Sequence, residues 1–158
     1  ADLKKSLPRL PLVDKTRDFK AFASAGKKLA EIHLGYETNV KPYAGVTITG
    51  LEKGNFSVDK IRFVDKDDKS AIQFNGSIRI SGIPLEAYYY VVNGRSPIEW
   101  VMERYQIKVD KDSGIKNDPN DWGKEHGQPR YIFDLILKLI TVSLETNKIV
   151  RGLPELTF

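Results

Sequence analysis

The chain contains no cysteine, which excludes a disulfide framework and a thiolate metal site and favours an intracellular, cytoplasmic setting. No segment resembles a signal peptide or a membrane-spanning helix, so we expect no membrane partner. With 158 residues, 41% of them hydrophobic, the chain has enough apolar material for a core. We therefore expect residues 1–158 to form a single domain.

Sequence signatures of catalysis are also missing. There is no Gly-rich phosphate loop, no His-Glu-x-x-His motif and no Gly-x-Ser-x-Gly elbow. Residues 110–114 superficially resemble a calcium loop but lack its later Gly and Glu. Glu103, Lys108 and Asp110 fit a metal-dependent nuclease only through a highly degenerate pattern. We predict no catalytic residue, no metal and no cofactor.

The charge balance is mildly basic. There are 25 Lys and Arg residues against 21 Asp and Glu residues, which gives a net charge of +4. This balance permits a polyanionic partner without requiring one. Because the chain begins with Ala1 rather than Met, we expect it to be part of a longer polypeptide.

The first part of the chain combines an extended segment with a helix. The prolines of residues 7–12 disfavour helix, and residues 1–15 have the character of a linker. An amphipathic helix is predicted from Thr16 to about Gly35. His33, at the edge of its apolar face, is expected to pack or to cap rather than to catalyse. That face comprises Phe19, Phe22, Ala23, Leu29, Ala30 and His33.

The middle of the chain has the pattern of an antiparallel sheet. Apolar and polar residues alternate in residues 46–48 and 60–63, and again on both sides of Asn75-Gly76. This dipeptide is a strong hairpin signal. The hairpin would pair Ile72 and Phe74 with Ile78 and Ile80. On the outer, solvent-facing side we expect Lys69, Gln73 and Arg79.

Residues 85–92 carry conflicting signals. Three consecutive tyrosines and two valines indicate a strand by propensity alone. Pro84 and Glu86 at one end, with Asn93-Gly94 at the other, are start and stop signals of a helix, which we predict instead. At least one of the tyrosines must face the core.

The most sharply specified stretch is residues 93–122. Ser96 and Glu99 form a capping box, with Pro97 at the first helical position. The apolar face of this helix comprises Ile98, Val101, Met102 and Tyr105. A polar loop then runs from Gln106 to Trp122. It either presents hydrogen-bonding groups to a partner or is a solvated connection whose Asp and Asn residues make turns.

The last long element, residues 130–150, is a helix apolar enough to be buried on most sides. Asp134 and Lys138 are spaced for an ion pair within its single polar stripe, and Gly152 ends it. The stripe comprises Asp134, Lys138, Thr141, Glu145 and Lys148. Together these elements predict an α+β fold, in which a small antiparallel sheet packs with an N-terminal helix and C-terminal helices.

Six short segments of the sequence, taken together and in this order, are similar to those of one protein family. They are Leu-Pro-Arg-Leu-Pro at 7–11, Phe-Ala-Ser-Ala-Gly-Lys-Lys-Leu-Ala at 22–30, Asn-Gly-Arg-Ser-Pro-Ile-Glu-Trp at 93–100, Asn-Asp-Pro-Asn-Asp-Trp at 117–122, Pro-Arg-Tyr-Ile at 129–132 and Thr-Val-Ser-Leu-Glu-Thr at 141–146. They resemble the C-terminal specificity domain of type ISP restriction–modification enzymes, often described as predicted helicases. The similarity is weakest between about Lys41 and Ser81.

This resemblance implies a non-catalytic target recognition domain at the end of a large polypeptide. The parent would combine nuclease, ATP-driven translocase and adenine-N6 methyltransferase, with all enzymatic motifs upstream. The partners implied are double-stranded DNA, read chiefly in the major groove, and the upstream methyltransferase domain. The alternative is a module that packs against another domain without reading bases, which the apolar last helix motivates.

The resemblance also directs the choice of candidate residues, because phosphate contacts set register and base contacts give specificity. The phosphate candidates are Arg95, Lys108, Lys111 and Lys116. The base-reading candidates are Arg62, Lys69, Gln73, Asn75 and Arg79, in the segment that departs most from the family phrases. Residues 117–122 are expected to be a structural loop or an interface with the methyltransferase.

Overall fold

The computed structural model describes residues 13–155, so most of the linker-like segment 1–15 lies outside the described residues. Helices combine with a four-stranded antiparallel sheet and a separate two-stranded ribbon, which confirms the α+β prediction. The elements are α1 (Thr16–Leu34), β1 (Thr47–Thr49), η2 (Leu51–Lys53), β2 (Arg62–Phe63), β3 (Ala71–Gln73), β4 (Arg79–Ser81), η3 (Leu85–Tyr88), α2 (Pro97–Arg104), β5 (Lys108–Val109), β6 (Lys116–Asn117), α3 (Asn120–Glu125) and α4 (Tyr131–Arg151).

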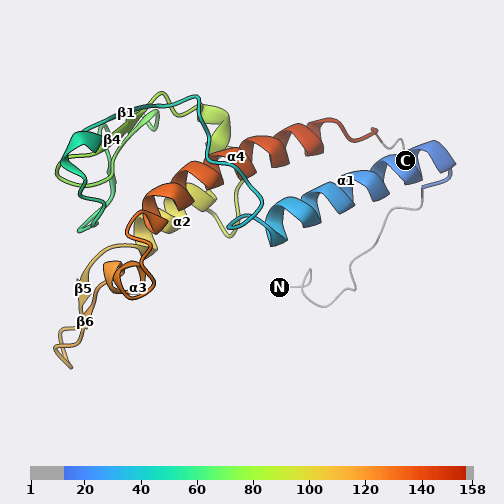
Figure 1. The fold of residues 1–158 in the computed structure, drawn as a ribbon. Coiled ribbons are helices and arrows are strands. Elements are labelled where there is room, and N and C mark those ends of the chain that lie inside the picture. The colour runs from blue at the N-terminus through green and yellow to red at the C-terminus, as the bar shows by residue number, and fades with distance from the viewer. Residues whose placement is uncertain (1–12, 156–158) are drawn as a thin grey trace.

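Helix α4 is the central element of the fold. Helices α1 and α2 and the short helix η3 all pack against it, and the sheet lies beside its first half (Figure 1). Its apolar side chains are buried around most of the helix, as the sequence predicts. Phe133 meets Phe74 of the sheet edge-on, with ring centroids 5.4 Å apart. This contact joins the helix and the sheet in one hydrophobic core.

The polar stripe of α4 fastens the connection between α1 and β1. The expected ion pair between Asp134 and Lys138 is wrong, because each side chain has another partner. Asp134 pairs with Arg130 at 3.2 Å, and the Lys138 ammonium donates to the carbonyl oxygen of Glu37. Thr141 donates to a further carbonyl of the same connection at 2.9 Å. The stripe therefore binds backbone as well as facing solvent.

The sheet has the strand order β1-β4-β3-β2, with every neighbour antiparallel. One cross-strand row consists of Ile48, Ile80, Ile72 and Phe63, directly opposite one another. Ile72 and Ile80 are fully buried, so this row is the core face of the sheet. Because side chains alternate along a strand, the adjacent rows must point outward.

The predicted hairpin is confirmed in its pairing. Ile72 of β3 is opposite Ile80 of β4, and the turn between the strands contains three residues that begin with Asn75. Neither Asn75 nor Gly76 has a positive φ, unlike the residues of a type I′ turn. The turn is instead closed by the Asn75 side chain, described below.

Helix α1 forms where predicted, but its packed face differs from the expected one. Phe19 is 61% exposed, whereas Asp18 is buried. The helix packs on α4, and only a narrow stripe of it is covered. The Nε2 atom of His33 lies 2.9 Å from the Thr146 hydroxyl, and the His33 ring stacks on Tyr90, which confirms a packing role.

The predicted helix over residues 85–92 is wrong in length, since only the four-residue η3 forms. Tyr88 faces the core and is 8% exposed, as expected for one of the three tyrosines. Val92 forms an isolated β-bridge across the Asn93-Gly94 turn, where both residues have positive φ. The β-branched valines favour this extended path over continuation of the helix.

The capping box that starts α2 is confirmed. The Ser96 hydroxyl accepts from the backbone N–H of Glu99 at 3.3 Å, and the Glu99 carboxylate accepts from the backbone N–H of Ser96 at 3.0 Å. Pro97 occupies the first position and Ile98 is fully buried, so the predicted face packs inward. Within residues 13–155, no helix is long and apolar enough to cross a membrane.

Candidate functional site

The outer face of the sheet carries a row of polar side chains. Arg62 of β2 is opposite Gln73 of β3, which is opposite Arg79 of β4, which in turn pairs with Thr49 of β1. Directly opposed residues point to the same side of a sheet. Both arginines are exposed. The structure therefore brings three of the five base-reading candidates into one row.

The two amide side chains of this region are hydrogen-bonded within the hairpin. Gln73 donates to the carbonyl oxygens of Asn75 and Ile78 at 2.7 and 3.1 Å. The Oδ1 atom of Asn75 accepts from the backbone N–H groups of Ser77 and Ile78, at 2.9 and 2.8 Å. Its Nδ2 atom donates to two carbonyls of residues 55–57, both at 2.9 Å. Asn75 has thus used its whole hydrogen-bonding capacity.

Lys69 does not share the outer face, so that expectation is wrong. Its ammonium donates to Glu99 of α2 at 2.8 Å and lies within 6 Å of the ring centroids of Phe63 and Tyr88. Burial acts to raise the pKa of Glu99, but hydrogen bonds from Lys69 and Ser96 outweigh it and lower the pKa below its usual range. Lys69 lies in the turn before strand β3, so the alternation of side chains along the strand does not determine the face of the sheet to which Lys69 points.

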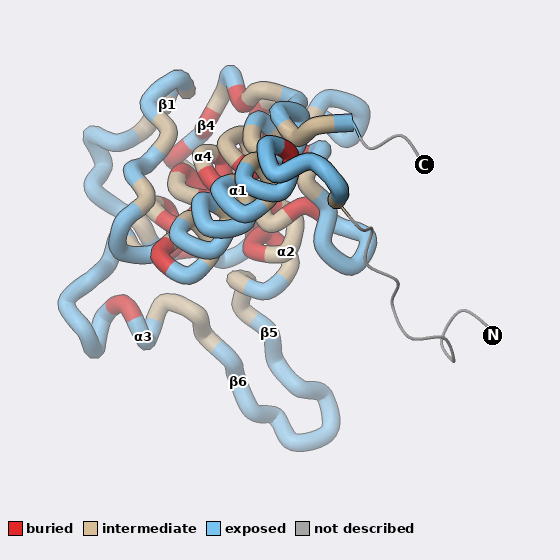
Figure 2. Tube along the Cα trace, turned by 90° about the vertical axis from the view of Figure 1, so that its right-hand side faces the viewer, coloured by how far each residue is buried: buried red, intermediate tan, exposed pale blue. Residues whose placement is uncertain are grey.

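The segment predicted as a polar loop contains a β-ribbon, β5 and β6, followed by the short helix α3. The ribbon projects from the body of the molecule and is exposed along its length (Figure 2). Lys108, Lys111 and Lys116, three of the four phosphate candidates, lie on it and are exposed. Asp110 closes its turn by accepting from Ser113, whose hydrogen bonds lower the pKa of Asp110. Asp110 thus makes a turn, as one of the two alternatives for this segment supposes, but the segment is a ribbon rather than an irregular connection.

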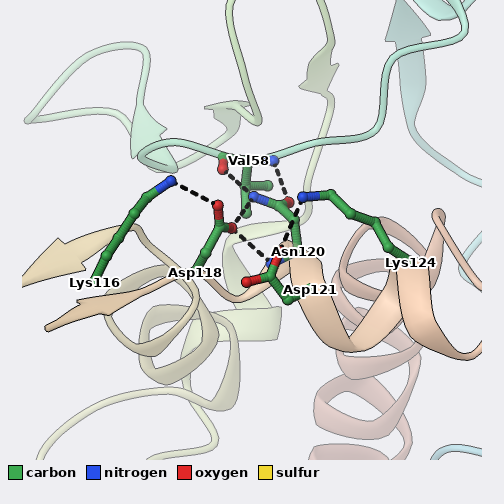
Figure 3. Close-up of polar contacts among 6 residues, drawn as sticks. All are labelled: Val58, Lys116, Asp118, Asn120, Asp121 and Lys124. Atoms are coloured by element: carbon green, nitrogen blue, oxygen red, sulfur yellow. Dashed lines mark hydrogen bonds and ion pairs between the residues drawn. The ribbon is translucent and has the colours of Figure 1, made fainter.

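The base of the ribbon is bonded to the body by the side chain of Asn120 (Figure 3). Its Oδ1 atom accepts from the backbone N–H of Val58, and its Nδ2 atom donates to the Val58 carbonyl, both at 2.7 Å. Asp118 accepts from Asn120 and from Lys116, and these bonds lower the pKa of Asp118 to about 2. Residues 117–122 are therefore structural, as one of the two alternatives supposes, but they are not a loop, because Asn117 belongs to β6 and Asn120 begins α3.

A hollow of about 370 Å³ lies between the hairpin turn and the base of the ribbon. Its lining includes the polar side chains of Asn75 and Ser77 from the hairpin and of Asn120 and Lys124 from the ribbon side. The sheet and the ribbon therefore border one concave surface.

The fourth phosphate candidate, Arg95, lies apart from the ribbon. Its guanidinium pairs with Glu103 and sits 5.4 Å from the centroid of the Trp100 ring. Trp100 itself donates to the Val92 carbonyl at 2.7 Å. Arg95 is thus part of a local cluster that braces the start of α2.

The carboxylates of the nuclease pattern have partners of their own. Glu103 faces Arg95, and Asp110 is bound in the ribbon turn. Within the described range, no cluster of three or more His, Cys, Asp or Glu side chains is placed to hold a metal ion.

Sequence reasoning missed the ribbon and, with it, two exposed residues on one of its faces. Asn117 is directly opposite Lys108, and Ile115, 68% exposed, lies one step along the same face. The available signal was the turn sequence Asp-Lys-Asp-Ser-Gly at 110–114 between two short segments that each carry one apolar residue.

The chain belongs to a family of specificity domains, that of the Type ISP C-terminal specificity domain. The family model matches residues 1–135, which confirms the resemblance in the sequence. Among curated proteins, none matches the chain.

Three solved structures resemble the chain over almost its whole length. The ATP-dependent Type ISP restriction–modification enzyme LlaBIII bound to DNA is 40% identical, with a TM-score of 0.87. A nuclease-deletion mutant of the Type ISP enzyme LlaGI in complex with a DNA substrate mimic is 41% identical, with a TM-score of 0.85. The DrdV–DNA complex is 26% identical, with a TM-score of 0.75.

The chain is much shorter than these relatives. The matches cover 99%, 98% and 99% of this chain but only 10%, 12% and 16% of the LlaBIII, LlaGI and DrdV chains.

Proposed function

We propose that this chain recognises a DNA target sequence, as the specificity domain of a longer restriction–modification enzyme. Family membership supports the proposal, as do the relatives, whose structures were solved with DNA. In this proposal, nuclease, translocase and adenine-N6 methyltransferase activities belong to the remainder of the polypeptide. The chain itself contributes binding and no chemistry.

The observation that carries the proposal is the open outer row of the sheet, where Arg62 and Arg79 flank Gln73. Arginine pairs with the O6 and N7 acceptors of guanine, the commonest specific contact in the major groove. Neither arginine needs to leave a buried partner to make it. Lys69 and Asn75 remain base-reading candidates, but each would first have to give up internal hydrogen bonds.

The ribbon lysines are proposed to hold phosphates. Lys108 and Lys111 form no ion pair with any of residues 13–155, whereas Lys116 is paired with Asp118 at 3.0 Å. Because the Lys116 side chain is 56% exposed, its ammonium can turn from Asp118 to a phosphate. Arg95 would have to exchange Glu103 for a phosphate in the same way.

We propose the upstream methyltransferase domain as the partner of a second surface. Leu85, Tyr89, Val91 and Val92 are between 39% and 61% exposed around η3 and the turn that follows it. Large exposed apolar side chains that cluster in this way mark protein contacts. Because this chain spans only a small share of its relatives, a neighbouring domain is the simplest partner.

The proposal is tested in the complete polypeptide with the double variant Arg62→Ala and Arg79→Ala. We expect sequence-specific binding to fall by roughly 30- to 25,000-fold, since each of the two bidentate pairs is worth about 1–3 kcal/mol. The matched control, Lys20→Ala with Lys28→Ala, removes the same charge from the exposed side of α1 and should leave specificity intact.

Deletion of the domain separates the two candidate functions. If the enzyme without these residues still recognises its methylation site, target recognition is wrong and the chain is an interaction module. If specificity is lost while the methyltransferase stays folded and binds its cofactor, target recognition stands.

A further inference from the structure

We propose that the β5–β6 ribbon is itself a base-reading element, in which Asn117 reads an adenine in the major groove and Ile115 contacts a thymine methyl group. This inference rests on the proposed function, because it assumes that the domain binds DNA. It changes the role of the ribbon from phosphate binding alone to sequence readout.

The asparagine and glutamine side chains of the two hairpins differ in whether their amide groups have hydrogen-bond partners. The Asn117 amide is exposed and has no hydrogen-bond partner among residues 13–155, whereas the Asn75 amide is bound at all four positions. Gln73 also donates twice within the hairpin. Asparagine recognises adenine through its N6 and N7 atoms, which requires a free amide. Asn117 meets this requirement and the sheet amides do not.

The shape of the ribbon suits the major groove. The major groove is about 12 Å wide and admits a two-stranded β-ribbon. The ribbon projects from the body with both of its faces exposed (Figure 2). Lys108 lies in β5, Lys116 in β6 and Lys111 in the turn between them. From these positions they can contact the phosphates on either side of the groove.

Two of the exposed side chains lie on one face of the ribbon. Asn117 is opposite Lys108, and the Asp110 N–H donates to the Ile115 carbonyl at 2.9 Å, which extends the ladder by one pair. Ile115 and Asn117 therefore point to the same side. An A·T pair presents both groups that this face suits, the N6 and N7 atoms of adenine and the methyl group of thymine.

The base of the ribbon is rigid. Asn120 bonds both backbone groups of Val58, and Asp118 accepts from the backbone N–H and the side chain of Asn120, so the body sets the position of the residues next to β6 (Figure 3). A reading side chain next to this anchor keeps its position without being ordered by the DNA. Preorganisation of this kind reduces the entropic cost of binding.

The test measures binding of the complete polypeptide to its own recognition site and to every single-base-pair variant of that site. Asn117→Ala should reduce discrimination at one A·T pair by on the order of 5- to 100-fold and leave binding to random duplex DNA unchanged. The control Asn39→Ala removes another exposed asparagine, in the turn that follows α1, and should change neither quantity.

Modified DNA makes the assignment atom by atom. A deaza-adenine without the N7 acceptor at the assigned position should weaken binding of the natural protein and have no further effect on Asn117→Ala. Uracil in place of thymine removes only the methyl group, and its effect should disappear in Ile115→Ala.

Three outcomes would overturn the inference. Asn117→Ala weakens all sequences alike, or changes nothing, or impairs only association with the rest of the enzyme, which would make the ribbon a protein contact. Each can occur while the effect of the Arg62 and Arg79 variants persists, so failure of this inference is distinguishable from failure of the proposed function.

Discussion

The domain contains two antiparallel hairpins of similar length that differ in their asparagine side chains. One side chain is hydrogen-bonded inside the fold and the other is exposed. In the β3–β4 hairpin, the side chain of Asn75 is buried and completes four hydrogen bonds inside the fold. In the β5–β6 ribbon, Asn117 is exposed, and hydrogen bonds join the base of the ribbon to the body. The same residue type is a structural element in one hairpin and an exposed side chain, proposed to read a base, in the other.

The difference teaches that exposure alone does not identify a binding residue. What matters is whether the donor and acceptor groups already have partners. A buried amide that loses its partners carries a desolvation cost, whereas an exposed amide exchanges water for a ligand. Mutations in the two hairpins should therefore separate stability from recognition.

The largest effect is expected from Asn75→Ala. This change leaves two N–H groups and two carbonyls of the hairpin and residues 55–57 without their partner, and we expect a loss of about 3 kcal/mol in unfolding free energy. Urea denaturation measures it. The matched Asn117→Ala should change stability by no more than about 0.5 kcal/mol. Equal losses would refute the contrast between the hairpins.

A somewhat smaller effect is expected from Gly50→Ala, next to the same hairpin. Gly50 has a φ of 82°, and an added Cβ would lie 2.0 Å from the Ser77 carbonyl oxygen. Left-handed strain costs about 1–2 kcal/mol and the clash adds to it, so we expect about 2–3 kcal/mol by thermal or urea unfolding. Gly54→Ala has the same strain with open space around it, and a loss as large as that of Gly50→Ala would show that the contact with Ser77 is unimportant.

The anchor of the ribbon should be worth less. Asn120→Ala removes both hydrogen bonds to Val58, and we expect a loss of about 1–2 kcal/mol together with faster hydrogen exchange at the Val58 amide. Asn55→Ala removes a bond to Ser57 in an exposed turn and is the control. Unchanged exchange at Val58 would mean that the ribbon is held by something other than Asn120.

The smallest effect concerns pH. Hydrogen bonds from Lys116 and Asn120 lower the pKa of Asp118 to about 2, below the unfolded value of about 3.9. The stabilisation from Asp118 is therefore fully present above pH ~4 and is lost as the pH falls through 2. NMR titration should show the pKa of Asp118 rising in Lys116→Met but not in Lys111→Met. A rise in both variants would indicate a general charge effect instead.

The sequence predicts those parts of the fold whose signals are local. The capping box of Ser96 and Glu99, the apolar helix α4 and the pairing of Ile72 with Ile80 all follow from periods and turn residues within a short window. The outer row of Arg62, Gln73 and Arg79 follows from alternation once that pairing is known.

The ribbon could not be predicted in the same way. Its strands have two residues each, too few to show a period, and its anchor joins Asn120 to Val58 across 62 positions of sequence. Lys69 was placed on the wrong side of the sheet because it lies in a turn, where strand alternation does not apply. The partner of Asp134 was also missed, because the Arg130 side chain competes for the same carboxylate.

The bond between Asn120 and Val58 uses only the main chain of residue 58. The side chains of residues 108–115 and of Asn117 have no part in that attachment, so these residues can be exchanged without loosening it. If the ribbon reads bases as proposed, the target preference can change by replacement of a short segment on an unchanged scaffold. Under that proposal, transplanting the segment between relatives is expected to alter the target site.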